Sequence, residues 1–183
     1  MADFEIFILA GGKSSRMGED KGLMSLFGKP MIQYVLEEVK KLDVAISIIS
    51  NNSAYKKFNF PVYKDIIKDV GPLGGIHSAL SRSEKPKIVI LSCDTPYVTI
   101  ELIEKLLNHS DEAKIIIPAF EEQLHPLIGI YHQEALSHIE AEINNSTFKI
   151  IEAIKKYDNL VIDANNFDKI VFKNLNSKAD VIH

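Results

Sequence analysis

Short apolar runs recur along this chain with little alternation between hydrophobic and polar positions. The runs are rich in isoleucine and valine, which is typical of strands that are covered on both faces. Strands of this kind form parallel sheets, because the helices that connect them pack on both sides. The main strands that we expect span residues 4–9, 44–49, 87–91 and 114–117, and shorter ones are expected near residue 62 and over residues 127–131, 160–162 and 170–172.

Between these runs, apolar residues repeat at the spacing of a helix. The pattern predicts helices over residues 31–39 and 100–107, the second behind Thr99 as its N-cap. Two further helices are expected over residues 133–143 and 147–156. Since strands and helices alternate, we predict a three-layer α/β/α sandwich around a doubly wound, mostly parallel sheet.

Four segments that follow expected strands are rich in glycine, asparagine and carboxylates. In an open α/β sheet, ligands bind outside the carboxyl ends of the strands, near the point where the strand order reverses. We therefore expect these segments to gather at one edge of the sheet and to form the functional site. They comprise residues 10–22, 50–53, 64–75 and 92–97.

The composition is that of an ordinary globular protein, with 183 residues, 46% of them hydrophobic and 25% charged. This length fits one domain, which we expect to span residues 1–183. The formal net charge of −4 argues against nucleic acid as a partner, because phosphate-backbone binders need a basic face. The sequence has neither an apolar run of membrane-spanning length nor the basic start of a secretory signal. We therefore expect a soluble cytosolic protein that does not insert into membranes.

A long connection, "LAGGKSSRMGEDKGLMSLFGKPM", follows the first expected strand. Residues 11–30 carry four cationic side chains against two acidic ones in an otherwise acidic chain. The stretch matches neither the Walker pattern nor the G-x-G-x-x-G fingerprint. Its glycines let backbone N–H groups surround an anion, while Arg16 can grip phosphate oxygens in a fork and Lys21 can act as a mobile charge. The stretch therefore predicts a triphosphate site, and the alternative is a solvated surface loop.

Asp94, in "IVILSCDTPYV", is a second candidate because it directly follows a buried strand. Pro96 turns the chain away, so we expect the carboxylate to face the edge of the sheet. A hard oxygen ligand in this place suits Mg²⁺, which binds one or two carboxylates together with substrate phosphates. The alternative is that Asp94 only caps the following turn. Cys93 beside it is the only cysteine, which excludes an intrachain disulfide, and a buried thiol fits it better than a nucleophile.

Four stretches together resemble the molybdenum cofactor guanylyltransferase family in their order and spacing: "LAGGKSSRMGEDKG", "FGKPMI", "VGPLGG" and "CDTPYV". The resemblance runs from Ile8 to about Asn176, with the specific motifs in the first part of the chain. Broader relatives are sugar-1-phosphate nucleotidyltransferases and the cytidylyltransferases of isoprenoid synthesis. The resemblance thus implies a Rossmann-like fold of the nucleotide-diphospho-sugar-transferase type.

The resemblance also implies roles for particular residues. Arg16 and Lys21 would hold the phosphates, and Asp94 would bind Mg²⁺ and act with these two cations in catalysis. Asn176, or as the alternative Asn174, would lie near the metal. The nucleoside contacts would fall on Leu9, Ala10, Gly11, Gly12, Asn51 and Asp65, with Asn52 and Asp69 as the alternatives to the last two.

Two histidines have both a functional and a structural interpretation. His125, in "EEQLHPLIGIY", resembles the region that faces the acceptor, where it could contact the pterin or its phosphate. A histidine before a proline at the start of a strand is more often structural. His77, in an expected helix four residues after Leu73, can serve packing or contact.

The implied reaction is transfer of GMP from GTP to the phosphate of molybdopterin, with release of pyrophosphate and with Mg²⁺ as cofactor. The second glycine of "LAGG" favours GTP, because the molybdopterin cytidylyl relatives tend to carry "LAAG". The implied partners are GTP, molybdopterin and, transiently, other molybdenum cofactor proteins, and the expected state is a monomer. The alternatives are a cytidylyltransferase for molybdopterin or for a sugar or isoprenoid phosphate, and a nucleotide-binding domain without catalysis.

Overall fold

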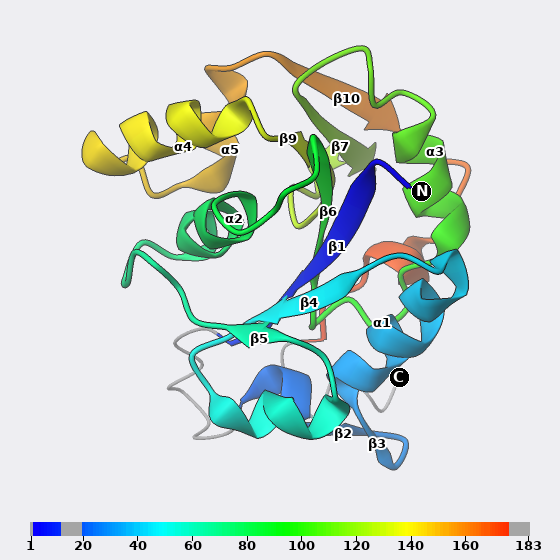
Figure 1. The fold of residues 1–183 in the computed structure, drawn as a ribbon. Coiled ribbons are helices and arrows are strands. Elements are labelled where there is room, and N and C mark those ends of the chain that lie inside the picture. The colour runs from blue at the N-terminus through cyan, green and yellow to red at the C-terminus, as the bar shows by residue number, and fades with distance from the viewer. Residues whose placement is uncertain (1, 12–19, 176–183) are drawn as a thin grey trace.

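The computed structural model describes residues 2–11 and 20–175 of the chain (Figure 1). In this part, eight strands form one sheet in the order β10-β7-β9-β6-β1-β4-β5, and β8 pairs with β7. The strands of the sheet are β1 (Phe4–Leu9), β4 (Ile46–Ile49), β5 (Val62–Tyr63), β6 (Lys87–Ser92), β7 (Ile115–Phe120), β8 (Gln123–Leu124), β9 (Ile128–His132) and β10 (Asn159–Asp163).

The sheet is mostly parallel, as the apolar runs predict. β1 is an interior strand and pairs in parallel with β4 and with β6, so that Ile8 faces Ile48 on one side and Leu91 on the other. Two strands are exceptions, because β9 runs antiparallel to both of its neighbours, β6 and β7, and β8 runs antiparallel to β7. Seven of the eight expected strands are confirmed, with small differences at their ends.

Helices cover both faces of the sheet, which confirms the predicted three layers (Figure 1). Successive residues of β1 point to opposite faces, since Ile6 and Ile8 pack in one apolar core while Phe7 and Leu9 pack in the other. The first core lies under α1 (Met31–Val39) and α3 (Ile100–Leu107), and the second lies under α2 (Pro72–Leu80), α4 (Ala135–Asn144) and α5 (Ile150–Lys155).

The expected strand over residues 170–172 is wrong. These residues belong to the 3₁₀ helix η4 (Lys169–Phe172), which begins where the Asp168 carboxylate accepts a hydrogen bond from the Ile170 N–H at 2.9 Å. Phe172 is buried and stacks on Phe120 of β7, with 4.9 Å between the ring centres. The apolar run is therefore explained by packing of a short helix against the core and not by a strand.

Thr99 occupies the N-cap position of α3, as predicted, but another side chain supplies the hydrogen bond. The Ile100 N–H donates to Glu38 Oε1 of α1 at 3.1 Å, which joins the two helices on this face. The remaining short elements are η1 (Lys21–Leu23), the hairpin of β2 (Ser25–Leu26) and β3 (Lys29–Pro30), η2 (Lys40–Leu42) and η3 (Ser53–Phe58).

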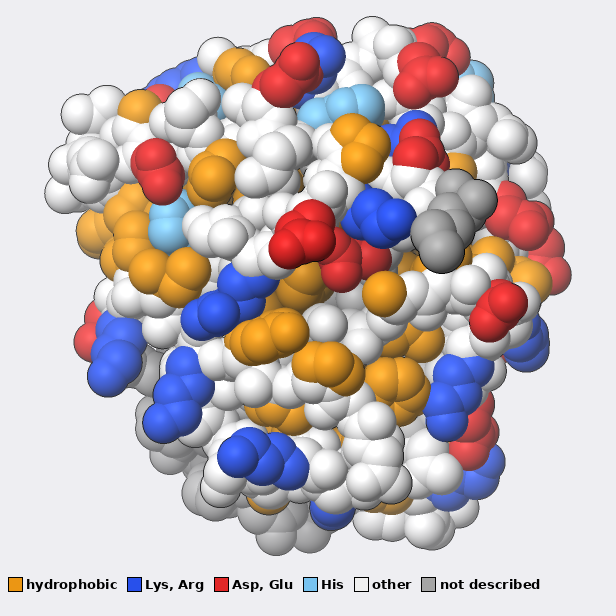
Figure 2. Space-filling model, viewed as in Figure 1, with side chains coloured by type: hydrophobic (Ala, Val, Ile, Leu, Met, Phe, Trp, Pro, Cys, Tyr) orange, Lys and Arg blue, Asp and Glu red, His pale blue; other side chains and the backbone are white. Residues whose placement is uncertain are grey.

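The surface mixes both signs of charge. Figure 2 shows basic, acidic and hydrophobic side chains side by side across the face in view. Among the described residues, the helices are all too short or too polar to span a bilayer.

Candidate active site

A hollow lies at the carboxyl ends of β1, β4 and β6, beside the start of α2. It has a volume of about 830 Å³ and is lined from all four of the segments that we expected to meet at this edge. The prediction of their common location is therefore confirmed. The lining residues that the sequence analysis named are Leu9, Ala10, Gly11, Lys21, Asn51, Asn52, Asp65, Asp69, Cys93 and Asp94.

One wall of this cavity carries a cation beside a carboxylate. Lys21 Nζ lies 3.8 Å from Asp94 Oδ2, and both side chains are partly exposed. The Ser92 hydroxyl donates to Asp94 Oδ1 at 2.6 Å, so the carboxylate is oriented from its own strand. The Asp94 carbonyl also accepts from the Leu175 N–H at 2.9 Å, which fixes the backbone at this position.

The turn after β6 is closed by Thr95, whose hydroxyl donates to the Ser92 carbonyl at 3.0 Å. Asp94 is thus directed into the cavity instead of capping the turn.

The opposite wall carries an asparagine and a carboxylate that bind one another. Asn51 Nδ2 donates to Asp65 Oδ2 at 2.7 Å, and the Asp65 N–H donates back to Asn51 Oδ1 at 3.2 Å. Burial raises the pKa of the Asp65 carboxyl, and the hydrogen bond from Asn51 partly opposes this rise. The pair is reciprocal and polar, and it presents amide and carboxylate groups toward the cavity at the end of β4.

The structure separates the roles of the two neighbouring asparagines. Asn52 Oδ1 accepts from the Ala54 N–H at 3.0 Å and caps η3, while Asn52 Nδ2 donates to Asp20 Oδ2 at 3.0 Å. Both asparagines line the cavity and both amide groups are engaged at each end, Asn52 with Asp20 and Ala54 and Asn51 with Asp65 alone.

Asp20, Tyr55 and Ser92 are site residues that the sequence analysis missed. Asp20 lines the cavity, and its Oδ1 accepts from the Tyr55 hydroxyl and from the Gly22 N–H at 3.2 Å. The adjacent "DK" of the glycine-rich stretch was the signal that could have singled out Asp20. Tyr55 gives no such signal, because it stands in a polar stretch far from the loop that it contacts.

The floor beneath Lys21 is tightly packed. A Cβ atom at Gly22 would lie 2.9 Å from Cys93 Sγ and closer still to the Tyr55 hydroxyl, so only glycine fits. Burial, reinforced by the nearby Asp94 charge, raises the pKa of the Cys93 thiol to about 12, although a hydrogen bond from the Gly11 backbone lowers it in part. Cys93 is therefore a neutral packing residue, in line with the expectation that it is no nucleophile.

The two histidines lie apart from the lining of the cavity. His125 is nine-tenths buried and packs on the Phe172 ring, with 4.7 Å between ring centres, and burial lowers its pKa. Its Nε2 has no hydrogen-bond partner among the described residues. His77 is buried in α2, and its Nε2 lies 3.1 Å from Glu140 Oε1 of α4, so it serves packing between these helices.

Some predicted residues fall where the structure gives no placement. Gly12, Arg16 and Asn176 lie outside the described residues. Asn174 is described and exposed, and it does not line the cavity. The structure thus brings together Lys21, Asp94 and the nucleoside-side candidates, while the metal-side asparagine stays a prediction.

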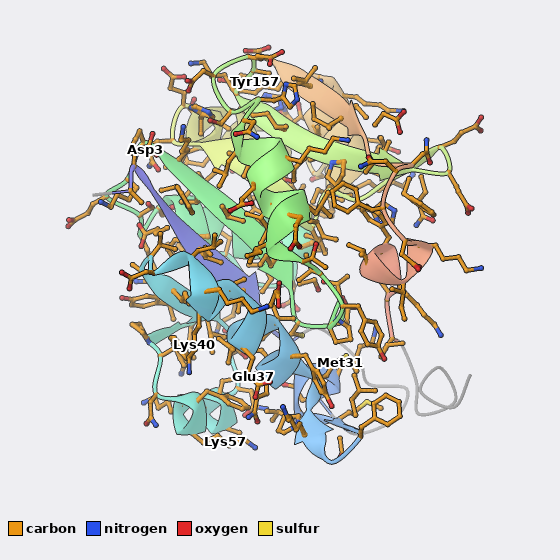
Figure 3. The ribbon with its side chains drawn as sticks, turned by 90° about the vertical axis from the view of Figure 1, so that its right-hand side faces the viewer. Asp3, Met31, Glu37, Lys40, Lys57 and Tyr157 are labelled. Carbon is orange, nitrogen blue, oxygen red and sulfur yellow. The ribbon has the colours of Figure 1, made fainter. Side chains whose placement is uncertain are left out.

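A second hollow of about 410 Å³ lies between α1 and η3, and Figure 3 labels Glu37, Lys40 and Lys57 on its walls. Lys40 Nζ lies 5.1 Å from the centre of the Phe60 ring, and Lys57 Nζ lies 5.3 Å from that of Phe58. Lysines that cover aromatic rings are ordinary surface packing. The larger cavity is therefore the stronger candidate for an active site.

The layered sheet, with its cavity at the carboxyl ends of the strands, defines a Rossmann-like α/β protein. More specifically, the chain belongs to the family of MobA-like NTP transferase domains, which residues 6–158 match. It is 35% identical over 182 residues to a "Probable molybdenum cofactor guanylyltransferase" of Flavobacterium johnsoniae, covering 99% of this chain and 96% of the relative. It is 34% identical over 179 residues to the molybdenum cofactor guanylyltransferase of Vibrio campbellii, covering 95% and 91%. The crystal structure of the molybdopterin-guanine dinucleotide biosynthesis protein A from Archaeoglobus fulgidus superposes with a TM-score of 0.82 at 25% identity, covering 97% of this chain and 94% of that one.

Proposed function

We propose that this protein is a nucleotidyltransferase that moves GMP from GTP to the phosphate of molybdopterin and releases pyrophosphate. The observation that carries the proposal is the placement of Lys21 and Asp94 across 3.8 Å on the wall of a cavity at the carboxyl ends of three strands. A volume of about 830 Å³ lies within the range of small-molecule sites and suits a nucleotide with part of its acceptor. The names of the family relatives support the choice of GTP and of molybdopterin.

In the proposed reaction, a phosphate oxygen of molybdopterin attacks the α-phosphorus of GTP. A bond forms between this oxygen and the α-phosphorus, and the bond from the α-phosphorus to the bridging oxygen of the β-phosphate breaks. Pyrophosphate leaves with that bonding pair. The second pKa of a phosphate monoester is about 6, so the nucleophile is mostly ionised at neutral pH and needs no general base.

The work of the protein is therefore to bring two polyanions together and to compensate their charge. Lys21 lies where it can contact the phosphates from the end of the glycine-rich stretch, and Arg16 is proposed to act with it. Gly71 and Pro72, at the start of α2, also line the cavity, and the positive end of a helix favours anions. The Asn51 and Asp65 pair is proposed to face the nucleoside.

The residues present fit a magnesium ion that the substrate phosphates help to hold. Among the described residues, no group of three or more carboxylate, histidine or cysteine side chains is arranged to hold a metal by itself. Asp94, with one oxygen oriented by Ser92, supplies the single hard ligand that Mg²⁺ needs when phosphates and waters complete its coordination. Asn176 is proposed as a further neighbour. When bound, the ion would neutralise phosphate charge and orient the phosphates.

The proposal is tested by mixing the protein with molybdopterin, Mg²⁺ and either GTP or CTP and measuring pyrophosphate release. We expect turnover with GTP that depends on molybdopterin. Asp94→Asn and Lys21→Met should each lower kcat by about a hundredfold or more, because each removes a charge that stabilises the transition state. Asp111→Asn is the matched control, since this carboxylate is 94% exposed, lies 3.5 Å from Lys87 Nζ at the start of β6 and does not line the cavity.

Each alternative has its own outcome in this assay. Turnover with CTP in place of GTP would assign the protein to cytidylyl transfer, and nucleotide binding without turnover would make it a noncatalytic domain. Near-normal rates in Asp94→Asn or Lys21→Met, with the melting temperature unchanged, would contradict the proposed site.

A further inference from the structure

Asp20, on the wall of the cavity, accepts three hydrogen bonds. Its Oδ1 accepts from the Tyr55 hydroxyl and from the Gly22 N–H at 3.2 Å, and its Oδ2 accepts from Asn52 Nδ2 at 3.0 Å. Tyr55 is fully buried, so its hydroxyl has a fixed position. Hydrogen bonds to a carboxylate are about twice as strong as neutral ones. The chain directly before Lys21 is therefore held from three directions.

Two of the donors come from η3 and its N-cap, namely the Tyr55 hydroxyl and the Asn52 amide. Asn52 is itself fixed, because its Oδ1 caps η3 through the Ala54 N–H and its own N–H donates to Ser50 Oγ at 3.2 Å. Burial raises the pKa of Tyr55, and its hydrogen bond to Asp20 contributes to that rise, so this hydroxyl remains a donor at neutral pH. A continuous set of hydrogen bonds thus runs from the end of β4 to the residue that precedes Lys21.

We propose that Asp20, held by Tyr55 and Asn52, is the positioning residue that sets Lys21 in its catalytic place opposite Asp94. This inference rests on the proposed function of Lys21 as a phosphate ligand. Asp20 acts through Lys21 and does not touch the substrate. Because Gly22 is packed against Tyr55 and Cys93, the backbone around Lys21 has little room for another position once Asp20 is seated.

The rival interpretation gives Asp20 a direct role through its negative charge, as a ligand of the metal. The two interpretations differ in what they require of position 20. Positioning requires an acceptor for Tyr55 and Gly22 and a partner for Asn52, whereas direct ligation requires a carboxylate at position 20 itself.

The first test is Tyr55→Phe, which removes one donor and leaves the ring in the core. We expect kcat for GMP transfer to fall about tenfold or more, because a small displacement of a charged group lowers the rate of a pre-organised site. The matched control is Tyr34→Phe, whose hydroxyl donates to the Leu26 carbonyl at 2.7 Å outside the cavity. We expect the control to keep its kcat although it also loses a partly buried hydrogen bond.

The second test exchanges the acceptor and the donor. Asp20→Asn alone places an amide NH₂ group against the NH₂ group of Asn52, and turning over the Asn52 amide would sacrifice the cap at Ala54. The double variant D20N/N52D restores every hydrogen bond of the set: the position 20 oxygen still accepts from Tyr55 and Gly22, and the position 52 carboxylate accepts from both the position 20 amide and Ala54. The net charge is unchanged.

We expect D20N to lose about tenfold or more in kcat and the double variant to recover most of that loss. Melting temperatures identify a loss of rate that comes from loss of folding. Recovery of kcat in the double variant is a readout that a ligating carboxylate would not give, because position 20 then carries no carboxylate. The inference is overturned if D20N/N52D folds and stays as slow as D20N, or if Tyr55→Phe turns over like wild type. Failure of the proposed function is seen separately, as a wild-type protein that neither binds nor turns over GTP.

Discussion

Asp65 shows how two opposing effects set the charge of one residue on the cavity wall. Burial raises the pKa of its carboxyl above the usual value of 3.8, and the amide of Asn51 lowers it again by donating to the ionised form. A carboxyl whose pKa is raised in the folded state favours folding at low pH. That contribution is lost as the pH rises through the folded-state pKa. The amide of Asn51 therefore favours the ionised form of Asp65 against the effect of burial.

A pH titration can test this balance. Asn51→Ala removes the donor, so we expect the pKa of Asp65 to rise further and the acid limb of GTP binding to move to higher pH. Calorimetric titrations with GTP between about pH 4 and about pH 8 measure how the affinity falls on the acid side. Asn166→Ala serves as the control, because Asn166 accepts from Lys105 Nζ at 2.8 Å outside the cavity. An unchanged limb in Asn51→Ala would show that Asp65 is not the group that titrates.

For single residues, the sequence predicts the location of a side chain in the site when that location follows from the strand the residue belongs to. Asp94 could be placed because it directly follows a buried apolar run and a proline redirects the chain after it. The sequence could not predict the hydrogen-bond partners of Asp20, because Asn52 and Tyr55 lie 32 and 35 residues further along the chain. Only the folded sheet brings β1 and β4 side by side and so places the loop against η3.

Among the elements, α2 has the most demanding start. Gly71 has φ +64° and ψ −150°, a conformation that is essentially restricted to glycine, and Pro72 then opens the helix. The Gly71 carbonyl accepts from the Gly74 N–H at 3.1 Å, which closes the first turn. Because Gly71 and Pro72 line the cavity, the geometry of this turn decides where the N-terminal end of α2 points.

Gly71→Ala should lower the stability of the fold and also weaken GTP binding. We expect a loss of about 1 to 3 kcal/mol in the free energy of unfolding, measured by urea denaturation, together with weaker GTP binding. Gly28→Ala is the matched control, since Gly28 also has a positive φ, +86°, but lies in the turn between β2 and β3 with nothing near its Cβ position. The control should lose stability and keep its affinity for GTP. Equal affinities in both variants would argue against a role for the start of α2.

Elements with long apolar patterns were predictable and short ones were not. The bounds of α1 and α3 agree with the helical spacing of their apolar residues. Residues 170–172 were wrongly predicted as a strand, because a buried 3₁₀ helix and a short buried strand present the same run of apolar residues. The Asp168 cap distinguishes them, and it is visible only in the fold.

For the molecule as a whole, the topology explains why one edge carries the chemistry. β1 lies between its parallel neighbours β4 and β6, and all three strands end at the same edge, so the segments after them converge there. The sequence predicted this convergence from strand polarity alone. It could not predict the antiparallel β9 between β6 and β7, because a buried apolar run does not specify the direction of its neighbours.

Because the cavity is built from segments far apart in the chain, a ligand that fills it should stabilise the whole fold. A ligand at a hundred times its Kd adds about 2.7 kcal/mol to the free energy of unfolding, which for a chain of this size corresponds to roughly 5 to 10 °C in Tm. We expect GTP with Mg²⁺ to produce such a shift in a thermal melt and CTP to produce a smaller one at the same concentration. Asp94→Asn should abolish the part of the shift that depends on Mg²⁺ while keeping a smaller shift from GTP alone, because the nucleoside side of the cavity is unaltered. A larger shift with CTP would reverse the assignment of the nucleotide, and a Mg²⁺-dependent shift that survives in Asp94→Asn would place the metal elsewhere.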